Sequence, residues 1–197
     1  MIKYSIIIPT HQRARLLYRC ISSIKKQKYA NLFEIIVISD IIDSDTTDVC
    51  NSLLGKNDIY IRRSGKNGPA NSRNLGLDVA TGAYIFFLDD DDCWSSNFSE
   101  ILEEKISFNE KQFLYFNCII IKERRHKDRI EFLSKNCLDL SNALNPEVFI
   151  KNQVHMSCFI FPKWLINDTR FDPHMRAYED WDFLLSIFEK EMPTFFP

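Results

Sequence analysis

Four consecutive carboxylates, Asp89 to Asp92, are the residues in this chain with the clearest capacity for chemistry. They directly follow the apolar run Tyr84–Leu88, which is short, rich in aromatic and branched residues, and therefore typical of a buried strand. The acids then stand where a strand leaves its sheet, the place where open α/β sheets bind ligands. Adjacent carboxylates repel one another unless positive charge offsets them, and a hard divalent cation with oxygen ligands does so. An isolated acidic run is more often a solvated loop, but the buried strand before it favours a site.

A second group of acids lies near the C-terminal end, in Glu179-Asp180-Trp181-Asp182. These residues begin a predicted helix that continues to Phe188. Acids in a first helical turn can simply complement the helix dipole. Taken without other motifs, these acids are best interpreted in that simpler way.

The elements that must position these groups alternate between strand and helix. Apolar runs predict strands, and apolar residues at helical spacing predict helices. The predicted strands are 4–8, 33–38, 59–61 and 84–88, and the predicted helices are 14–26, one that follows caps at 43–45, and one from Pro69 to near Gly82. Continuous rather than alternating apolar strands indicate a mostly parallel sheet covered on both faces.

In such a sheet the polar residues after the first, second and fourth strands should converge on one edge. These are Thr10, Asp40 and the acidic run that begins at Asp89. No Gly-x-Gly-x-x-Gly follows the first strand, so the dinucleotide fingerprint is absent. Beyond residue 95 the pattern predicts a helix at 97–108, strands at 113–121 and 156–161, and the helix at 179–188. It assigns nothing to residues 122–144.

Composition narrows the class of protein further. A length of 197 residues predicts one domain, and the net charge of −2 argues against a general nucleic-acid binder. No stretch approaches the roughly 20 apolar residues of a membrane helix. The cysteines form no Cys-x-x-Cys pair and mostly lie in apolar patterns, which predicts buried free thiols in a reducing cytosol. They are Cys20, Cys50, Cys93, Cys118, Cys137 and Cys158.

Four motifs together resemble the family-two glycosyltransferases with the GT-A fold, a Rossmann-like nucleotide-binding α/β fold with a mostly parallel central sheet flanked by helices. The motifs are Ile6-Ile7-Ile8-Pro9-Thr10, Ala70-Asn71-Ser72-Arg73-Asn74-Leu75-Gly76, Phe87-Leu88-Asp89-Asp90-Asp91-Asp92-Cys93-Trp94 and Tyr178-Glu179-Asp180-Trp181-Asp182. Each is weak to moderate alone, but all four occur in the family's order over about residues 3 to 190. The resemblance implies a single domain whose first half, about 1–95, binds a nucleotide-sugar. The second half, about 96–197, would bind the acceptor and supply the base.

The resemblance also implies roles for single residues. Asp180 would be the catalytic base and Asp91 the direct ligand of a divalent metal, Mn²⁺ or Mg²⁺. Residues expected to contact the nucleotide-sugar are Pro9, Thr10, Asp40, Arg73, Asp89 and Asp90, and those expected on the acceptor side are Glu179, Trp181 and His155. Simpler alternatives exist for several of them. Arg73 can pair with Asp78 on the surface, Thr10 and Asp40 can cap or turn the chain, and His155 can be an ordinary core or surface histidine.

Two features depart from the family pattern. Ser39-Asp40-Ile41-Ile42 stands where the family often has Asp-Asp-Gly-Ser, which puts the identity of the nucleotide base in doubt. The Gln-x-x-Arg-Trp motif and the membrane helices of processive synthases are absent. Relatives usually continue past the Glu-Asp helix, so we expect either a short member or a longer protein whose C-terminal part is missing.

The sequence thus predicts a metal-assisted, inverting glycosyltransferase in surface polysaccharide biosynthesis. It would be cytoplasmic, at the inner face of the membrane if it associates there. Thr10 with Asp40 favours a UDP-sugar donor, and the acceptor would be a glycan or a lipid-linked glycan. Two alternatives stay open: a catalytically silent relative that binds nucleotide or a partner, and a sugar-phosphate nucleotidyltransferase. The second lacks the Gly-rich basic loop that should follow its first strand.

Overall fold

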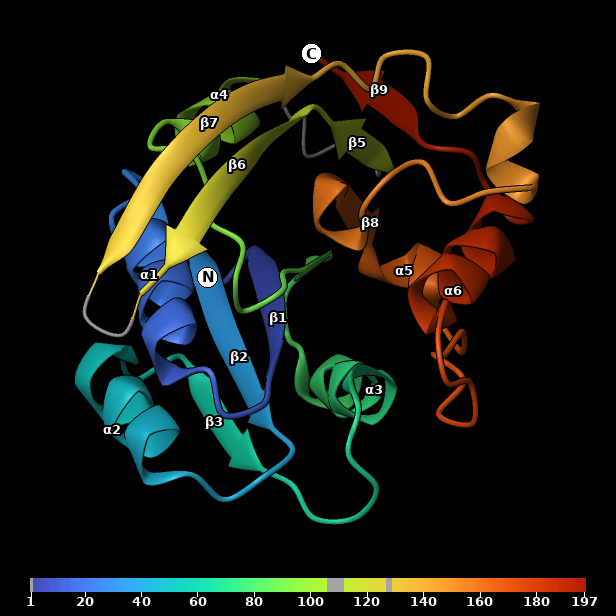
Figure 1. The fold of residues 1–197 in the computed structure, drawn as a ribbon. Coiled ribbons are helices and arrows are strands. Elements are labelled where there is room, and N and C mark those ends of the chain that lie inside the picture. The colour runs from blue at the N-terminus through green and yellow to red at the C-terminus, as the bar shows by residue number, and fades with distance from the viewer. Residues whose placement is uncertain (1, 106–111, 127–128) are drawn as a thin grey trace.

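A seven-stranded sheet forms the centre of the computed structural model, which describes residues 2–105, 112–126 and 129–197 (Figure 1). Its first four strands in the chain are mutually parallel, as predicted, and β8 runs antiparallel to both of its neighbours. The order across the sheet is β3 (Ile59–Arg62), β2 (Phe33–Ser39), β1 (Tyr4–Thr10), β4 (Tyr84–Phe87), β8 (Phe159–Pro162), β5 (Leu114–Phe116) and β9 (Thr194–Phe196).

Helices cover both faces of this sheet. On one face lie α1 (Ala14–Lys25), α2 (Ser44–Leu53) and α4 (Phe98–Lys105), and on the other lie α3 (Pro69–Val79), α5 (Lys163–Ile166) and α6 (Glu179–Phe188). Strand β1 is buried along its whole length, and its side chains alternate between the two cores. Ile6 and Ile8 join the core under α1, whereas Ile7 joins the core under α3. This burial on both faces explains why the strand is continuously apolar.

Helix α3 lies unusually close to β1, and a glycine makes that approach feasible. A Cβ atom at Gly76 would stand only 2.4 Å from Cγ2 of Ile7, well inside van der Waals contact. The helix begins with Pro69 at its first position, as predicted, because the missing amide hydrogen is not needed there. The close packing holds the second half of α3 against the middle of β1.

The second half of the chain departs from the predicted elements in several places. The predicted strand 113–121 is two strands, β5 and β6 (Cys118–Arg125), divided at Asn117, whose Oδ1 accepts a hydrogen bond from the Leu140 amide at 2.7 Å. The predicted strand 156–161 starts with a 3-10 turn over Met156–Cys158 and becomes extended only in β8. Residues 122–144, which had no assignment, contain most of a hairpin of β6 and β7 (Ile130–Leu138). The predicted helix 97–108 is described as α4 up to residue 105, and its last predicted residues lie outside the described ranges.

The cysteines only partly follow the prediction of buried free thiols. All six are free, and Cys20, Cys50 and Cys158 are buried, but Cys93 and Cys137 are exposed. The prediction is wrong for those two because apolar neighbours along the chain do not guarantee burial. Among the described residues, no helix is both long enough and apolar enough to cross a bilayer.

Thiol reactivity provides a test of this packing. Burial raises the pKa of Cys50 to about 12 and also raises the pKa of Cys158, so neither forms a reactive thiolate near pH 8. We expect Ellman's reagent to react with Cys137 in the folded protein, and with Cys20, Cys50 and Cys158 only after unfolding. Cys137→Ser should remove a fast reacting thiol, and fast modification of Cys50 in the native state would contradict the packing.

Candidate functional site

A cavity of about 460 Å³ opens where the parallel strands β1 and β2 end and α3 begins. Five of the residues predicted to contact a nucleotide-sugar line it: Pro9, Thr10, Asp40, Arg73 and Asp89. The expected convergence of the first, second and fourth strand ends on one edge is therefore confirmed. The remaining lining residues are His11, Arg13, Asn67, Gly68, Pro69 and Ser72.

The four acids after β4 have different surroundings. Asp90 is fully buried and accepts a hydrogen bond of 2.6 Å from the Thr10 hydroxyl. Its Oδ1 lies 2.5 Å from Nη2 of Arg13. Burial raises the pKa of Asp90, while the bonds from Thr10 and Arg13 oppose that rise. The same arginine reaches Asp91 with Nη1 at 3.2 Å, so one guanidinium holds two adjacent carboxylates.

Asp92 turns away from this arginine. It accepts a hydrogen bond of 2.6 Å from the Ser157 hydroxyl, and burial raises its pKa, with His155 lowering it through its charge. His155, an expected acceptor-side residue, therefore lies on the Asp92 side of the acidic run. Its side chain is exposed. Asp89 and Asp91 keep 42% and 34% of their side-chain surfaces exposed, which leaves them as the two acids of the run that a ligand can reach.

Arg73 joins the acidic run to the start of α6. Its Nη2 lies 3.0 Å from Asp89, and its Nη1 donates to Glu179 at 3.0 Å. The side chain is only 6% exposed, and its guanidinium stands 5.3 Å from the ring centroid of Phe171. The alternative pairing with Asp78 is not observed, because Asp78 pairs with Arg170. The three residues form one Asp89–Arg73–Glu179 chain of charges across the two halves of the molecule.

Loss of this arginine should destabilise the fold measurably. Arg73→Met leaves Glu179, which is 15% exposed, without its partner. We expect the free energy of unfolding to fall by about 2 kcal/mol in urea titrations, the cost of an unsatisfied and largely buried polar group. Arg170→Met is the matched control, since it removes only exposed contacts: the pair with Asp78, worth under about 1 kcal/mol, and hydrogen bonds to the carbonyl oxygens of Asn167 and Thr169. Equal losses in the two variants would contradict a buried structural role for Arg73.

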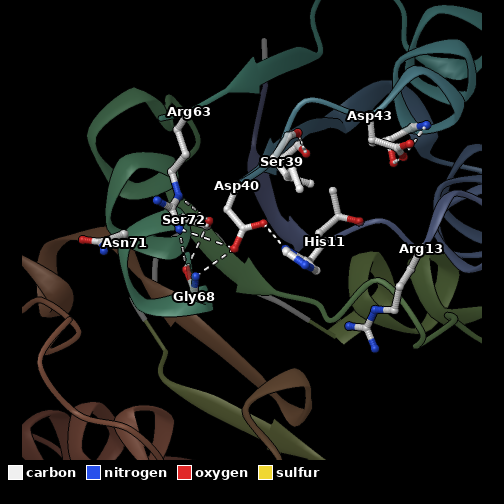
Figure 2. Close-up of polar contacts among 12 residues, drawn as sticks. His11, Arg13, Ser39, Asp40, Asp43, Arg63, Gly68, Asn71 and Ser72 are labelled. Carbon is white, nitrogen blue, oxygen red and sulfur yellow. Dashed lines mark hydrogen bonds and ion pairs between the residues drawn. The ribbon is translucent and has the colours of Figure 1, made fainter. Parts of the chain in front are cut away.

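Asp40 lies at the centre of a polar network at the end of β2 (Figure 2). Its Oδ2 accepts a hydrogen bond of 2.8 Å from the Gly68 amide, and its Oδ1 lies 2.5 Å from Nδ1 of His11. Asp40 is not the cap of α2, because Asp43 accepts the Thr46 amide at 3.0 Å and fills that role as predicted. Asp40 instead ties the loop before α3 to the end of β2.

Arg63 completes this network through contacts with the loop before α3. Its guanidinium donates to the carbonyl oxygens of Lys66 and Gly68 at 2.7 and 2.8 Å and to the Ser72 hydroxyl at 2.8 Å. Burial lowers the pKa of Arg63, and the nearby charge of Asp40 opposes this. The loop is therefore fixed from both sides, with Gly68 at a φ of 130° that favours glycine.

The start of α6 presents Asp180 in a setting unlike that of its neighbour. Glu179 is held by Arg73, whereas no Lys, Arg or His of the described residues pairs with Asp180. Asp180 is partly exposed, and its Oδ1 accepts the Trp181 amide at 2.8 Å. The indole of Trp181 donates to the Val148 carbonyl oxygen at 2.9 Å, which fixes this turn against the second half of the chain. Neither acid lines the cavity, so it holds only part of the predicted site.

Comparison with known proteins places this arrangement in a family. The sequence profile described as "Glycosyl transferase family 2" matches residues 5–167, which is most of the chain. The chain belongs to glycosyl transferase family 2. A curated relative from Campylobacter jejuni, a GalNAc(5)-diNAcBac-PP-undecaprenol beta-1,3-glucosyltransferase, is 33% identical over 183 residues, covering 91% of this chain and 58% of that protein. A second, the Escherichia coli UDP-Glc:alpha-D-GlcNAc-diphosphoundecaprenol beta-1,3-glucosyltransferase WfaP, is 34% identical over 57% of this chain and 43% of its own length.

Solved structures of other glycosyltransferases share the fold. Staphylococcus aureus TarS in complex with UDP superposes with a TM-score of 0.72 at 18% identity, covering 99% of this chain and 58% of that one. The mannosyltransferase PcManGT from Pyrobaculum calidifontis, in complex with GDP-Man and Mn²⁺, gives 0.68 at 16% identity over 99% and 54%. The fold of this family-2 chain is therefore of the GT-A type. The chain spans little more than half the length of these proteins.

The acidic run of this family-2 chain fits a divalent metal that is shared with a ligand. Among the described residues, no three His, Cys, Asp or Glu side chains gather as a complete cage. Hard cations such as Mg²⁺ are often held by one or two carboxylates together with substrate phosphates. Asp89 lines the cavity and Asp91 contacts its lining residue Arg13, so the two offer partly exposed carboxylates of that kind, with the oxygen donors such a cation prefers.

Three residues with evident contacts in the site were not singled out from the sequence: His11, Arg13 and Ser157. Arg13 and His11 fall in a short polar loop with no periodicity to interpret. The charge of Arg13 was a usable signal for that residue. It follows the end of one parallel strand, so it can pair with acids that follow the end of another strand. Ser157 carried no signal, since its contact with Asp92 depends on the path of the second half of the chain.

Proposed function

We propose that this chain transfers a sugar from a UDP-sugar to a lipid-linked glycan acceptor, with inversion and with a divalent metal, in the synthesis of a surface polysaccharide. The cavity at the carboxyl ends of β1 and β2 carries this proposal, because Asp40, Arg73 and the partly exposed acid Asp89 line it together, and Arg13 of the same lining contacts Asp91. A nucleotide lying over Asp40 can extend its diphosphate toward those acids. The first half of the chain would then hold the donor and the second half the acceptor, at the inner face of the cytoplasmic membrane.

The relatives support the substrate classes. Both curated glucosyltransferases are named for acceptors with a diphosphate-linked undecaprenol, and WfaP is named for UDP-Glc. TarS structures contain UDP or UDP-GlcNAc. In this chain Asp40 has its two oxygens already bonded to Gly68 and His11, so a uracil N–H would have to share Oδ1 with His11 or displace it.

The residues of the site can be given roles in an inverting transfer. The acceptor hydroxyl is a poor nucleophile at neutral pH, and Asp180, as a carboxylate without an ion pair, would accept its proton during attack on the anomeric carbon. The nucleoside diphosphate leaves from the opposite face of the sugar. A bound divalent metal would neutralise the charge that develops on those phosphates. Arg73 would fix Asp89 on the donor side and Glu179 on the acceptor side, so that the two carboxylates keep a constant separation.

A catalytically silent binding protein is the main alternative. It would need nucleotide affinity but neither a free general base nor an accessible metal ligand. The exposure of Asp91 and the unpaired state of Asp180 favour an enzyme. Transfer of labelled sugar to an undecaprenol-diphosphate-linked glycan, or slow release of UDP from a UDP-sugar, distinguishes the two.

A thermal-shift panel of UDP, GDP and CDP, each with and without Mn²⁺, tests the donor assignment. Because a ligand that binds only the folded state adds stability by mass action, saturation at 100 times the dissociation constant should add about 2.7 kcal/mol. We expect the largest shift with UDP plus Mn²⁺ and little shift with Mn²⁺ alone. A larger shift with GDP or CDP would reject the uridine assignment.

A further inference from the structure

The hairpin of β6 and β7 stands apart from the central sheet as a separate two-stranded sheet (Figure 1). Contacts with α1 join its outer end to the body of the protein, while Cys118 and Leu138 at its base pack against the core. Arg19 of α1 holds Glu123 with two hydrogen bonds of 2.9 and 2.7 Å, and Arg15 donates to the His126 carbonyl oxygen at 3.5 Å. Helix α1 begins just after the cavity residues His11 and Arg13, so these contacts place the outer end of the hairpin beside the donor edge of the fold.

Neither face of the hairpin is covered by the described residues. Ile121 pairs across the strands with Lys135 on one face, and Ile120 pairs with Asn136 on the other, yet both isoleucines are more than 40% exposed. An apolar strand in a globular protein normally buries at least one face. The hairpin instead exposes five large apolar side chains: Ile119 at 43%, Ile120 at 42%, Ile121 at 50%, Phe132 at 61% and Leu133 at 47%.

The hairpin is also a basic segment of a weakly acidic protein. Residues 118–138 contain six Lys or Arg and three Asp or Glu, whereas the whole chain has a net charge of −2. The two acids in the described strands are already neutralised, Glu123 by Arg19 and Glu131 by Arg124. Lys122 and Lys135, which border the isoleucines, form no ion pair with any described residue. Apolar side chains flanked by free cations are the combination that binds an anionic membrane interface.

We propose that the β6–β7 hairpin docks this protein on the surface of an anionic lipid bilayer. The apolar side chains of one face enter the interface, and Lys122 and Lys135, which stand on opposite faces of the hairpin, extend their ammonium groups to the surrounding lipid phosphates. Charge favours this occupant over a second copy of the chain, because two hairpins of equal positive charge would repel each other. Docking here would bring the bilayer to the donor edge, where a lipid-linked acceptor must arrive. This inference goes beyond the proposed transfer and is tested without donor or acceptor.

Co-sedimentation with lipid vesicles provides the test. We expect the full chain to bind vesicles that contain phosphatidylglycerol, to bind pure phosphatidylcholine vesicles weakly, and to dissociate at high salt. The double variants Ile121→Ser/Leu133→Ser and Lys122→Glu/Lys135→Glu should each lower partitioning about tenfold. The matched controls are Ile42→Ser, at an isoleucine 78% exposed elsewhere, and Lys56→Glu/Arg62→Glu, at exposed cations outside the hairpin. Circular dichroism verifies that each variant is folded.

Two results would overturn the proposal. One is equal binding of the hairpin variants and the controls, and the other is a failure of the wild-type chain to bind anionic vesicles while it forms a hairpin-dependent dimer in ultracentrifugation. If a hairpin variant does not fold, a Cys93→Ser chain labelled at Cys137 with a polarity-sensitive dye provides the test, since Cys137 is exposed on β7 and Cys93 is exposed elsewhere. A blue shift with phosphatidylglycerol vesicles supports docking, and unchanged emission rejects it.

Discussion

Replacing Asp180 by asparagine is expected to lower the rate of sugar transfer at saturating donor by roughly 10²- to 10⁴-fold, the usual contribution of a general base. Nucleotide and metal binding should be unchanged, because Asp180 does not line the donor cavity and has no ion pair with a described residue. The measurement is transfer to a lipid-linked acceptor under saturating donor, with UDP affinity determined separately by calorimetry. Asparagine keeps the size of the side chain and can still accept the Trp181 amide, so the turn should remain intact.

Two neighbours on the same helical turn serve as comparisons. Glu179→Gln should have a smaller effect on the rate, since Glu179 faces Arg73 and residues adjacent on a helix point about 100° apart. Asp182→Asn, at an exposed acid of the same turn, should leave the rate nearly unchanged. Near-normal transfer by Asp180→Asn, or a larger loss from Glu179→Gln, would remove Asp180 from the role of base.

Asp91→Asn is expected to abolish most of the gain in UDP affinity that Mn²⁺ provides, and to lower the affinity for the metal by about 100-fold or more. Mutating even a residue that only hydrogen-bonds to a metal ligand typically lowers metal affinity 10- to 100-fold. Asp91 is partly exposed and lies outside the core, so the fold should persist. Its present partner is Arg13, which a bound metal would have to displace from Asp91 while Asp90 keeps its own contacts to that arginine.

Calorimetric titration of UDP with Mn²⁺ and with a chelator measures this difference directly. Asp48→Asn is a suitable control because it removes one exposed carboxylate on α2, far along the chain from the acidic run. In the control, Mn²⁺ should improve UDP affinity as much as in the wild-type chain. Metal dependence that persists in Asp91→Asn would assign the metal to Asp89 or to another group.

The first half of the fold could be predicted from the sequence because its strands are buried on both faces. A run such as Ile6–Ile8 has no polar position to confuse the pattern, and two of the helices between strands have clear start signals, the N-cap Asp43 and the first-position proline Pro69. The β6–β7 hairpin could not be predicted, because its isoleucines and phenylalanine face solvent and no core imposes a period of two. Asn117 ends β5 through a hydrogen bond to Leu140, a partner that no local pattern identifies.

The part of the site that lies at the ends of the parallel strands could be predicted from the sequence. Thr10, Asp40 and Asp89 converge as expected because parallel strands deliver their carboxyl ends to one edge. What the sequence left open was how each group is used. Arg63 was not among the predicted site residues, yet its side chain is buried against the loop at Gly68. Such roles depend on contacts between segments that only the assembled fold brings together.

The Asp89–Arg73–Glu179 chain also constrains how sequences of this kind can vary. An arginine that pairs with two carboxylates on separate segments cannot be replaced alone, because its loss leaves the largely buried acid at position 179 without an ion-pair partner. Family members that lack the arginine should therefore also lack an acid at the position of Glu179, while the acid matching Asp180 is free to remain. The positions of Arg73 and Glu179 would therefore change together among relatives, whereas the position of Asp180 would stay acidic.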